Sequence, residues 1–119
     1  MPSLSMQGPY SLDNESIDEY VTKTLPGNYA LGTVNDYKFI VKYVGRSDTD
    51  VNARLKTWVG KNYTRFKFSY ATSSKAAFAK ECKNFHDFGG TKKLDNDIHP
   101  GRPEDSDWGC PVCGVYDSI

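Results

Sequence analysis

Four side chains in the second half of the sequence have the types and spacing of zinc ligands. Cys82 and His86 are four residues apart, which places them on one face of a helix. Cys110 and Cys113 form a Cys-x-x-Cys pair, with Pro111 between the cysteines and Gly114 directly after them. Three cysteines and one histidine are a common tetrahedral set for structural Zn²⁺, with His99 as the alternative histidine. The spacing therefore predicts a structural zinc site, whereas free thiols or a redox pair are the other interpretations.

Glu81 precedes this group and occupies a position where an ordinary helix core would not place a carboxylate. On a helical wheel it falls between Phe85 and Phe88, within the predicted buried stripe. A buried carboxylate is costly unless a cation, a metal or a hydrogen-bond donor satisfies it. Two interpretations stay open. In the first, Glu81 is structural: it forms an ion pair within the fold, for example with Arg54, or lies at an edge of the helix where it reaches water. In the second, Glu81 is a functional carboxylate at a site.

A β-hairpin followed by a helix is predicted upstream of these ligands. Residues 28–34 and 37–44 are rich in β-branched and aromatic side chains, and residues 35–36 form the turn between them. Apolar side chains then recur at every fourth position over residues 51–59, which predicts a helix. Asp or Thr within residues 48–50 could cap its first turn.

A third strand and a longer helix complete the predicted domain. Residues 65–71 alternate polar and aromatic side chains, which is typical of a half-buried strand. A helix is predicted from about residue 75 to residue 88, capped by Ser73 or Ser74 and ended by two glycines. This order predicts an α+β fold in which helices flank a small three-stranded antiparallel sheet.

Charge divides the chain into three predicted segments. Residues 1–25 have a net charge of −3 and are predicted to be a polar acidic leader, residues 26–97 the domain, and residues 98–119 a zinc-binding tail packed on it. Residues 26–93 hold 13 Lys and Arg against 5 Asp and Glu, a net charge of +8. A basic centre favours a polyanionic partner, although an ordinary lysine-rich surface explains it as well.

The sequence predicts no membrane contact. No apolar run in the 119 residues approaches the roughly 20 residues that a membrane-spanning helix needs. The N-terminal residues also lack the basic and apolar blocks of a secretory signal. We therefore expect a cytoplasmic protein whose cysteines stay reduced or bind metal.

Two tyrosine tripeptides give the chain a family resemblance. Residues 27–29 are Gly-Asn-Tyr at the start of the first predicted strand, and residues 43–45 are Tyr-Val-Gly near the end of the second. Arg54 on the first predicted helix, Glu81 on the later helix and Asn96 follow in that order. This series resembles the GIY-YIG endonuclease family, with Asn and Val in place of the two isoleucines.

The resemblance implies a β-β-α-β-α core and hydrolysis of nucleic-acid phosphodiester bonds with one divalent metal ion. By this resemblance Glu81 would hold Mg²⁺ or Mn²⁺, and Tyr29 would be the general base or orient the attacking water. Tyr43 would position the phosphate or the water. Arg54 would offset charge in the transition state, and Asn96 belongs to the same catalytic set. These residue types suit the implied chemistry, since carboxylates bind hard cations and arginine presents a planar fork to phosphate oxygens.

The implied partner is nucleic acid, with DNA expected. Arg46, Tyr63 and Lys67 are candidate contacts to its backbone, and an ordinary surface or strand position is the plainer interpretation of each. Two functions stay open at this point. The chain is either a metal-dependent endonuclease or a catalytically silent, zinc-stabilised module that binds nucleic acid or protein.

Overall fold

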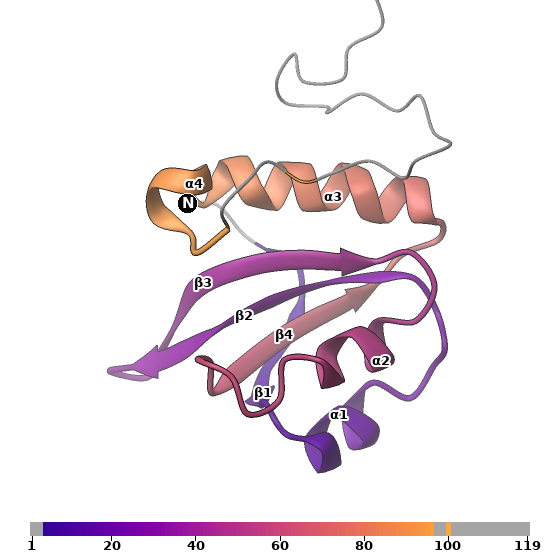
Figure 1. Cartoon of the computed structure of the whole chain (residues 1–119), viewed down its shortest axis with the longest axis horizontal. Helices are drawn as coiled ribbons and strands as arrows, with labels where there is room; N and C mark the ends of the chain where they lie inside the picture. The colour runs from indigo at the N-terminus through magenta and orange to yellow at the C-terminus, as the bar shows by residue number, and fades with distance from the viewer. Residues whose placement is uncertain (1–3, 97–99, 101–119) are drawn as a thin grey trace, which may run out of the picture.

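A computed structural model describes residues 4–96 and residue 100, which form an antiparallel sheet with helices on both of its faces (Figure 1). The elements are β1 (Gln7–Ser11), α1 (Asn14–Tyr20), β2 (Gly27–Asn35), β3 (Lys38–Ser47), α2 (Val51–Lys56), β4 (Arg65–Tyr70), α3 (Ser74–Asp87) and α4 (Gly90–Lys93). The strands lie in the order β1-β4-β2-β3, and each neighbouring pair is antiparallel. The predicted α+β class is therefore confirmed.

The sheet has four strands, so the predicted number of three is wrong. The additional strand is β1, which lies within the predicted leader and pairs with β4. Gly8 and Pro9 lie inside it, and both residue types are depleted from strands, which hid the strand from a propensity argument. Ile17 of α1 and Val21 just after it are buried in the core. Residues of the leader thus complete both the sheet and the core.

The predicted hairpin is present, with its turn one residue later than expected. Asn35 pairs with Lys38, and the two turn residues Asp36 and Tyr37 have φ values of 51° and 64°. Positive φ at both central residues is the type I′ geometry that matches the twist of the flanking strands. A register shift between Leu31 and Gly32 interrupts the ladder closer to the middle of the hairpin.

Two separate apolar clusters lie on the two faces of the sheet. α1 and α2 cover one face and α3 covers the other (Figure 1). The cluster under α1 and α2 consists of Leu12, Ile17, Val21, Tyr29, Leu31, Val51, Leu55, Phe66 and Phe68. The cluster on the α3 face consists of Leu4, Ala30, Val44, Phe85 and Leu94.

The helix caps follow the predicted chemistry. The Asp50 side chain accepts backbone N–H groups at the start of α2, and Ser73 accepts the Ala76 N–H at the start of α3, at 3.1 Å. α2 ends at Lys56, so Val59 lies beyond it rather than in a third helical turn. None of the described helices has the length and hydropathy to cross a membrane.

Candidate functional site

A cleft of about 460 Å³ opens beside the edge strand β3, between α2 and α3. The predicted catalytic residues Tyr29, Tyr43, Arg54 and Glu81 all line it. They come from β2, β3, α2 and α3 respectively, so the fold brings them together from four elements. The remaining lining residues are Gly45, Arg46, Ser47, Asp48 and Thr49.

The Tyr29 phenol is held in place by aromatic neighbours. Its ring is 1% exposed, and its hydroxyl accepts a hydrogen bond from Trp58 Nε1 at 3.0 Å. The Tyr43 ring stacks on it at a centroid distance of 6.4 Å and lies 4.6 Å from the Trp58 ring. Burial raises the pKa of the Tyr29 phenol, and hydrogen bonding from Arg54 and Trp58 offsets part of this increase. The phenol is therefore protonated near neutral pH.

Gly45 is the residue of β3 that faces Tyr29 across the hairpin. A Cβ atom at this position would overlap Cζ and Oη of the Tyr29 side chain. The ring is buried and cannot move aside at low cost. Gly45 therefore leaves the space that the phenol needs to reach the cleft.

Arg54 faces the cleft from α2. The Ser47 hydroxyl accepts the Asp50 N–H at 2.9 Å, and the Asp50 carboxylate in turn caps α2 at the Asn52 N–H, at 3.1 Å. These contacts tie the start of α2 to the end of β3 and so fix the direction of the helix. Hydrogen bonding with Tyr29 raises the pKa of the Arg54 guanidinium further, so Arg54 carries a fixed positive charge.

Glu81 is 8% exposed, and its partner is Arg46 rather than Arg54. Arg46 Nη1 lies 2.6 Å from Glu81 Oε1, and Arg46 Nε lies 2.8 Å from Asp48 Oδ1. The guanidinium also lies over the Phe78 ring, 5.1 Å from its centroid. Burial raises the pKa of the Glu81 carboxyl, although Arg46 acts in the opposite direction. The two effects compete, and burial prevails.

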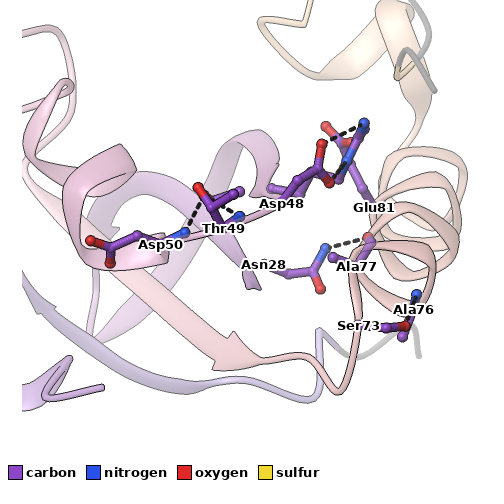
Figure 2. A network of polar contacts seen from close by, with 10 residues as sticks. Asn28, Asp48, Thr49, Asp50, Ser73, Ala76, Ala77 and Glu81 are labelled. Atoms are coloured by element: carbon purple, nitrogen blue, oxygen red, sulfur yellow. Dashed lines mark hydrogen bonds and ion pairs between the residues drawn. The ribbon is translucent and has the colours of Figure 1, made fainter. Parts of the chain in front are cut away.

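Asn28 anchors α3 above this ion pair. Its side-chain amide donates to the Ala77 carbonyl at 2.8 Å, as Figure 2 shows. Ala77 lies one helical turn before Glu81, so the bond fixes the part of α3 that carries the carboxylate. The asparagine in the first tripeptide is thus explained by a contact between β2 and α3, which an isoleucine could not make.

Asn96 does not line the cleft. Its Nδ2 atom donates to the Val44 carbonyl at 2.9 Å, and its Oδ1 atom accepts the Val44 N–H at 3.1 Å. Asp95 N–H donates to the Lys42 carbonyl at 2.6 Å. Residues 95–96 therefore continue the hydrogen bonding along the edge of β3. These contacts give Asn96 a structural role at the edge of β3, and its assignment to the catalytic set stays a prediction.

The three candidate nucleic-acid contacts lie in different places. Arg46 lines the cleft but is engaged by Glu81 and Asp48. Tyr63 packs on Tyr43 and Trp58 beside the cleft, and its hydroxyl donates to Asp95 Oδ2 at 2.8 Å. Lys67 lies on the α3 face of the sheet, with its ammonium 5.5 Å from the centroid of the Phe39 ring. The three side chains do not form one surface.

The predicted zinc ligands fall only in part within the described residues. Cys82 is buried in α3, and His86 follows one turn later, as predicted. His99, Cys110 and Cys113 lie outside the part of the chain that the structure describes. Within that part, no three side chains of His, Cys, Asp or Glu are grouped closely enough to hold a metal ion. Structural zinc therefore stays a prediction.

The cleft has a donor set that suits a hard divalent cation. Glu81 presents a carboxylate to an open, polar cavity, and Asp48 presents a second one. Mg²⁺ is commonly held by one or two carboxylates while it keeps several water ligands. Arg46 is the competing cation, since it already contacts Glu81 Oε1. The residues fit such a metal ion if Arg46 shares or releases that oxygen.

Trp58, Gly45 and the Arg46–Glu81 pair are site features that the sequence argument missed. Trp58 follows Arg54 by four positions, and this helical spacing could have placed both beside the cleft. Gly45 opposite Tyr29 and Arg46 beside Glu81 depend on strand register and on the angle of α3, which no local pattern contains.

Comparison of the chain with protein-family models, with curated proteins and with solved structures finds no match. The geometry of the cleft is therefore the basis for any functional assignment.

Proposed function

We propose that the chain is a metal-dependent endonuclease of the GIY-YIG type, which hydrolyses phosphodiester bonds in nucleic acid, with DNA as the expected substrate. The observation that carries the proposal is the convergence of Tyr29, Tyr43, Arg54 and Glu81 on one cleft. The element order from β2 to α3, two strands, a helix, a strand and a helix, agrees with the core that the family resemblance implies.

In this proposal Tyr29 orients the attacking water. Its oxygen accepts the Trp58 N–H, and its raised pKa keeps the phenolic proton in place near neutral pH. That proton can be donated to a water or a phosphate oxygen in the cleft. A role as general base requires a lower pKa, and a second positive charge beside the Arg54 guanidinium would be needed for it.

Arg54 and Tyr43 act on the phosphate. Arg54 carries a fixed charge in the last turn of α2, beside the cleft, and its planar fork of donors matches two phosphate oxygens. Such preorganised donors stabilise the charge that develops in the transition state. Tyr43 packs against both Tyr29 and Trp58 and limits the space in which the water and the phosphate can lie.

Glu81 would hold Mg²⁺ or Mn²⁺, with Asp48 as the nearest second carboxylate on the cleft. The bound cation would supply Lewis-acid stabilisation of the leaving oxygen. Asn28, through Ala77, keeps Glu81 directed at the cleft. Arg46 sets the charge balance, since it neutralises part of the two carboxylates before the substrate binds.

The test is a cleavage assay on single-stranded, duplex and branched DNA and RNA with Mg²⁺ or Mn²⁺. Glu81→Gln and Tyr29→Phe should each lower the cleavage rate by about 100-fold or more. Asp87→Asn makes the same chemical change elsewhere on α3, and Tyr10→Phe removes a phenol on β1, so both controls should cleave normally. If the unaltered protein cleaves none of these substrates, the enzyme proposal fails.

One contact favours a second candidate, a catalytically silent module that binds nucleic acid. Arg46 occupies Glu81 Oε1 at 2.6 Å and is itself held by Asp48, so the cleft is neutralised without a metal ion. Such a module would bind nucleic acid in a salt-sensitive way without turnover.

Binding of Mn²⁺ separates the two candidates. For a nuclease, titration followed by electron paramagnetic resonance of unbound Mn²⁺ should give a bound ion that Glu81→Gln removes. For the silent module, Glu81→Gln and the unaltered protein should bind Mn²⁺ equally poorly.

A further inference from the structure

The tip of the β2–β3 hairpin carries a side chain that the fold does not use. Tyr37 is 103% exposed and has a φ of 64°, in the left-handed region. For a bulky L-residue this backbone conformation is a genuine outlier. The second position of a type I′ turn is the one where glycine is strongly preferred. The tyrosine therefore brings strain to the turn and gains no burial in return.

Exposed apolar and basic side chains flank the turn at the tip. Val34 and Ile40 are 43% and 37% exposed, and the strand register places them on opposite faces of the hairpin. Lys38 and Lys42 are exposed on β3, between the tip and the cleft. Asp36 is the one acidic side chain of the hairpin, so this arm has net positive charge.

The tip lies at a fixed distance from the cleft. Asn35 is six positions after Tyr29 on β2, which corresponds to about 20 Å at roughly 3.3 Å per strand residue. In Figure 1 the turn between β2 and β3 lies at the opposite end of β3 from the connection to α2. A nucleic acid rises about 3.4 Å per base step, so roughly six steps separate a phosphate in the cleft from the tip.

We propose that this tip, ending in Tyr37, is a second contact for the nucleic-acid substrate and stacks on an unpaired base about six steps from the cleaved phosphate. The inference rests on the proposed function and narrows its substrate class to DNA with an overhang, a bulge or a junction. An exposed tyrosine ring offers a stacking face to any base, and the adjacent lysines attract the backbone. A contact of this kind would also explain why a tyrosine with a strained, positive φ occupies an exposed turn.

The first test measures binding by fluorescence anisotropy without Mg²⁺ or Mn²⁺, so that no cleavage occurs. The probes are a blunt duplex and the same duplex with a single-stranded overhang. Tyr37→Gly should weaken binding of the overhang probe by about tenfold, which is within the range for loss of one stacked base. Tyr37→Trp should retain binding of that probe, and the blunt duplex should not distinguish the variants. Tyr20→Ala, an exposed tyrosine on α1, is the control and should bind as the unaltered protein does.

The second test is thermal unfolding of Tyr37→Gly. Glycine adopts this φ without strain, so Tm should rise by about 4 °C. A fall in Tm would mean that Tyr37 supports the turn itself, and it would overturn the inference.

The outcomes separate this inference from the proposed function. If the unaltered protein binds neither probe, the proposed function and the inference fail together. If it binds both probes and Tyr37→Gly binds the overhang probe equally well, only the inference fails. Loss of self-association in Tyr37→Gly with unchanged DNA binding would assign the tip to protein docking and would also overturn it.

Discussion

The two faces of the sheet bury different kinds of side chain. The face under α1 and α2 is filled by rings and aliphatic chains, with Phe66 and Phe68 at its centre. The α3 face has a smaller apolar cluster and also buries Asn28, Glu81 and Asn84. Burying polar groups costs free energy that apolar packing does not. The face under α1 and α2 therefore supplies most of the stability. The α3 face buries polar side chains at a cost in stability, and a functional role for those side chains would explain why they are there.

The cleft lies at the edge of β3, where the two faces meet. The apolar face holds the Tyr29 phenol through Trp58, and the polar face holds the Glu81 carboxylate through Arg46 and Asn28. A phenol and a carboxylate with different environments thus reach one cavity from opposite sides of the sheet. The following substitutions test whether stability and site chemistry are divided in this way.

Phe68→Ala should have the largest effect on stability. The ring is fully buried, and such truncations cost about 3–5 kcal/mol. Asn28→Ala on the other face should cost about 1 kcal/mol, the usual net value of one hydrogen bond. Denaturant unfolding of both variants measures this difference. If Asn28→Ala proves the more destabilising of the two, the division between the faces is wrong.

Gly45→Ala should affect both properties at once. The new methyl group overlaps the Tyr29 phenol, so overpacking should cost about 1–3 kcal/mol. Displacement of the phenol by about 1 Å should also lower the cleavage rate by up to about 100-fold.

Gly60→Ala is the matched control for this substitution. Its φ of 83° makes alanine strained, but no atom lies within 4 Å of the added Cβ. It should lose stability in unfolding experiments without any change in cleavage per folded molecule. Equal losses of activity in both variants would show that Gly45 has no specific relation to Tyr29.

Local chemistry made the helices and the hairpin predictable. Asp50 and Ser73 cap helices where a capping argument places them, and the helical wheel placed Glu81 on the buried side of α3. Each of these features depends on residues within a few positions of one another. The sequence alone was sufficient for them because the interactions involved are short in range.

Features that depend on distant residues could not be predicted. Glu81 pairs with Arg46, which is 35 positions away, because the end of β3 lies under α3. The sequence argument named Arg54 as the example partner instead. β1 was missed because its pairing with β4, rather than its own composition, makes it a strand. The cleft was foreseen only through a family resemblance.

The pH dependence of stability tests the polar face. Burial raises the pKa of Glu81 above its ordinary value of 4.5, so the folded protein keeps this proton after the unfolded chain has lost it. The contribution of Glu81 is therefore fully present below pH 4.5 and is lost as the pH rises through the folded pKa. Each unit of raised pKa is worth about 1.4 kcal/mol.

The measurement compares the free energy of unfolding of the unaltered protein and Glu81→Gln across this pH range. Titrations common to both proteins cancel in the difference. The stability of the unaltered protein relative to Glu81→Gln should decline from pH 4.5 upward. An increase instead would mean that the attraction of Arg46 outweighs burial, and that the carboxylate is simply a stable ion pair.

Trp58→Phe should have a small effect on stability and the most specific effect on the phenol. The substitution keeps a ring beside Tyr43 but removes the donor to Tyr29 Oη, so stability should fall by about 1 kcal/mol. Because that hydrogen bond favours the phenolate, its loss should raise the pKa of Tyr29 further. Nuclear magnetic resonance of tyrosine labelled at Cζ would follow this titration, with Tyr29→Phe identifying the signal. A purely packing role for Trp58 would lower stability but leave that pKa unchanged, and the apolar face would then fill space beside the phenol without setting its chemistry.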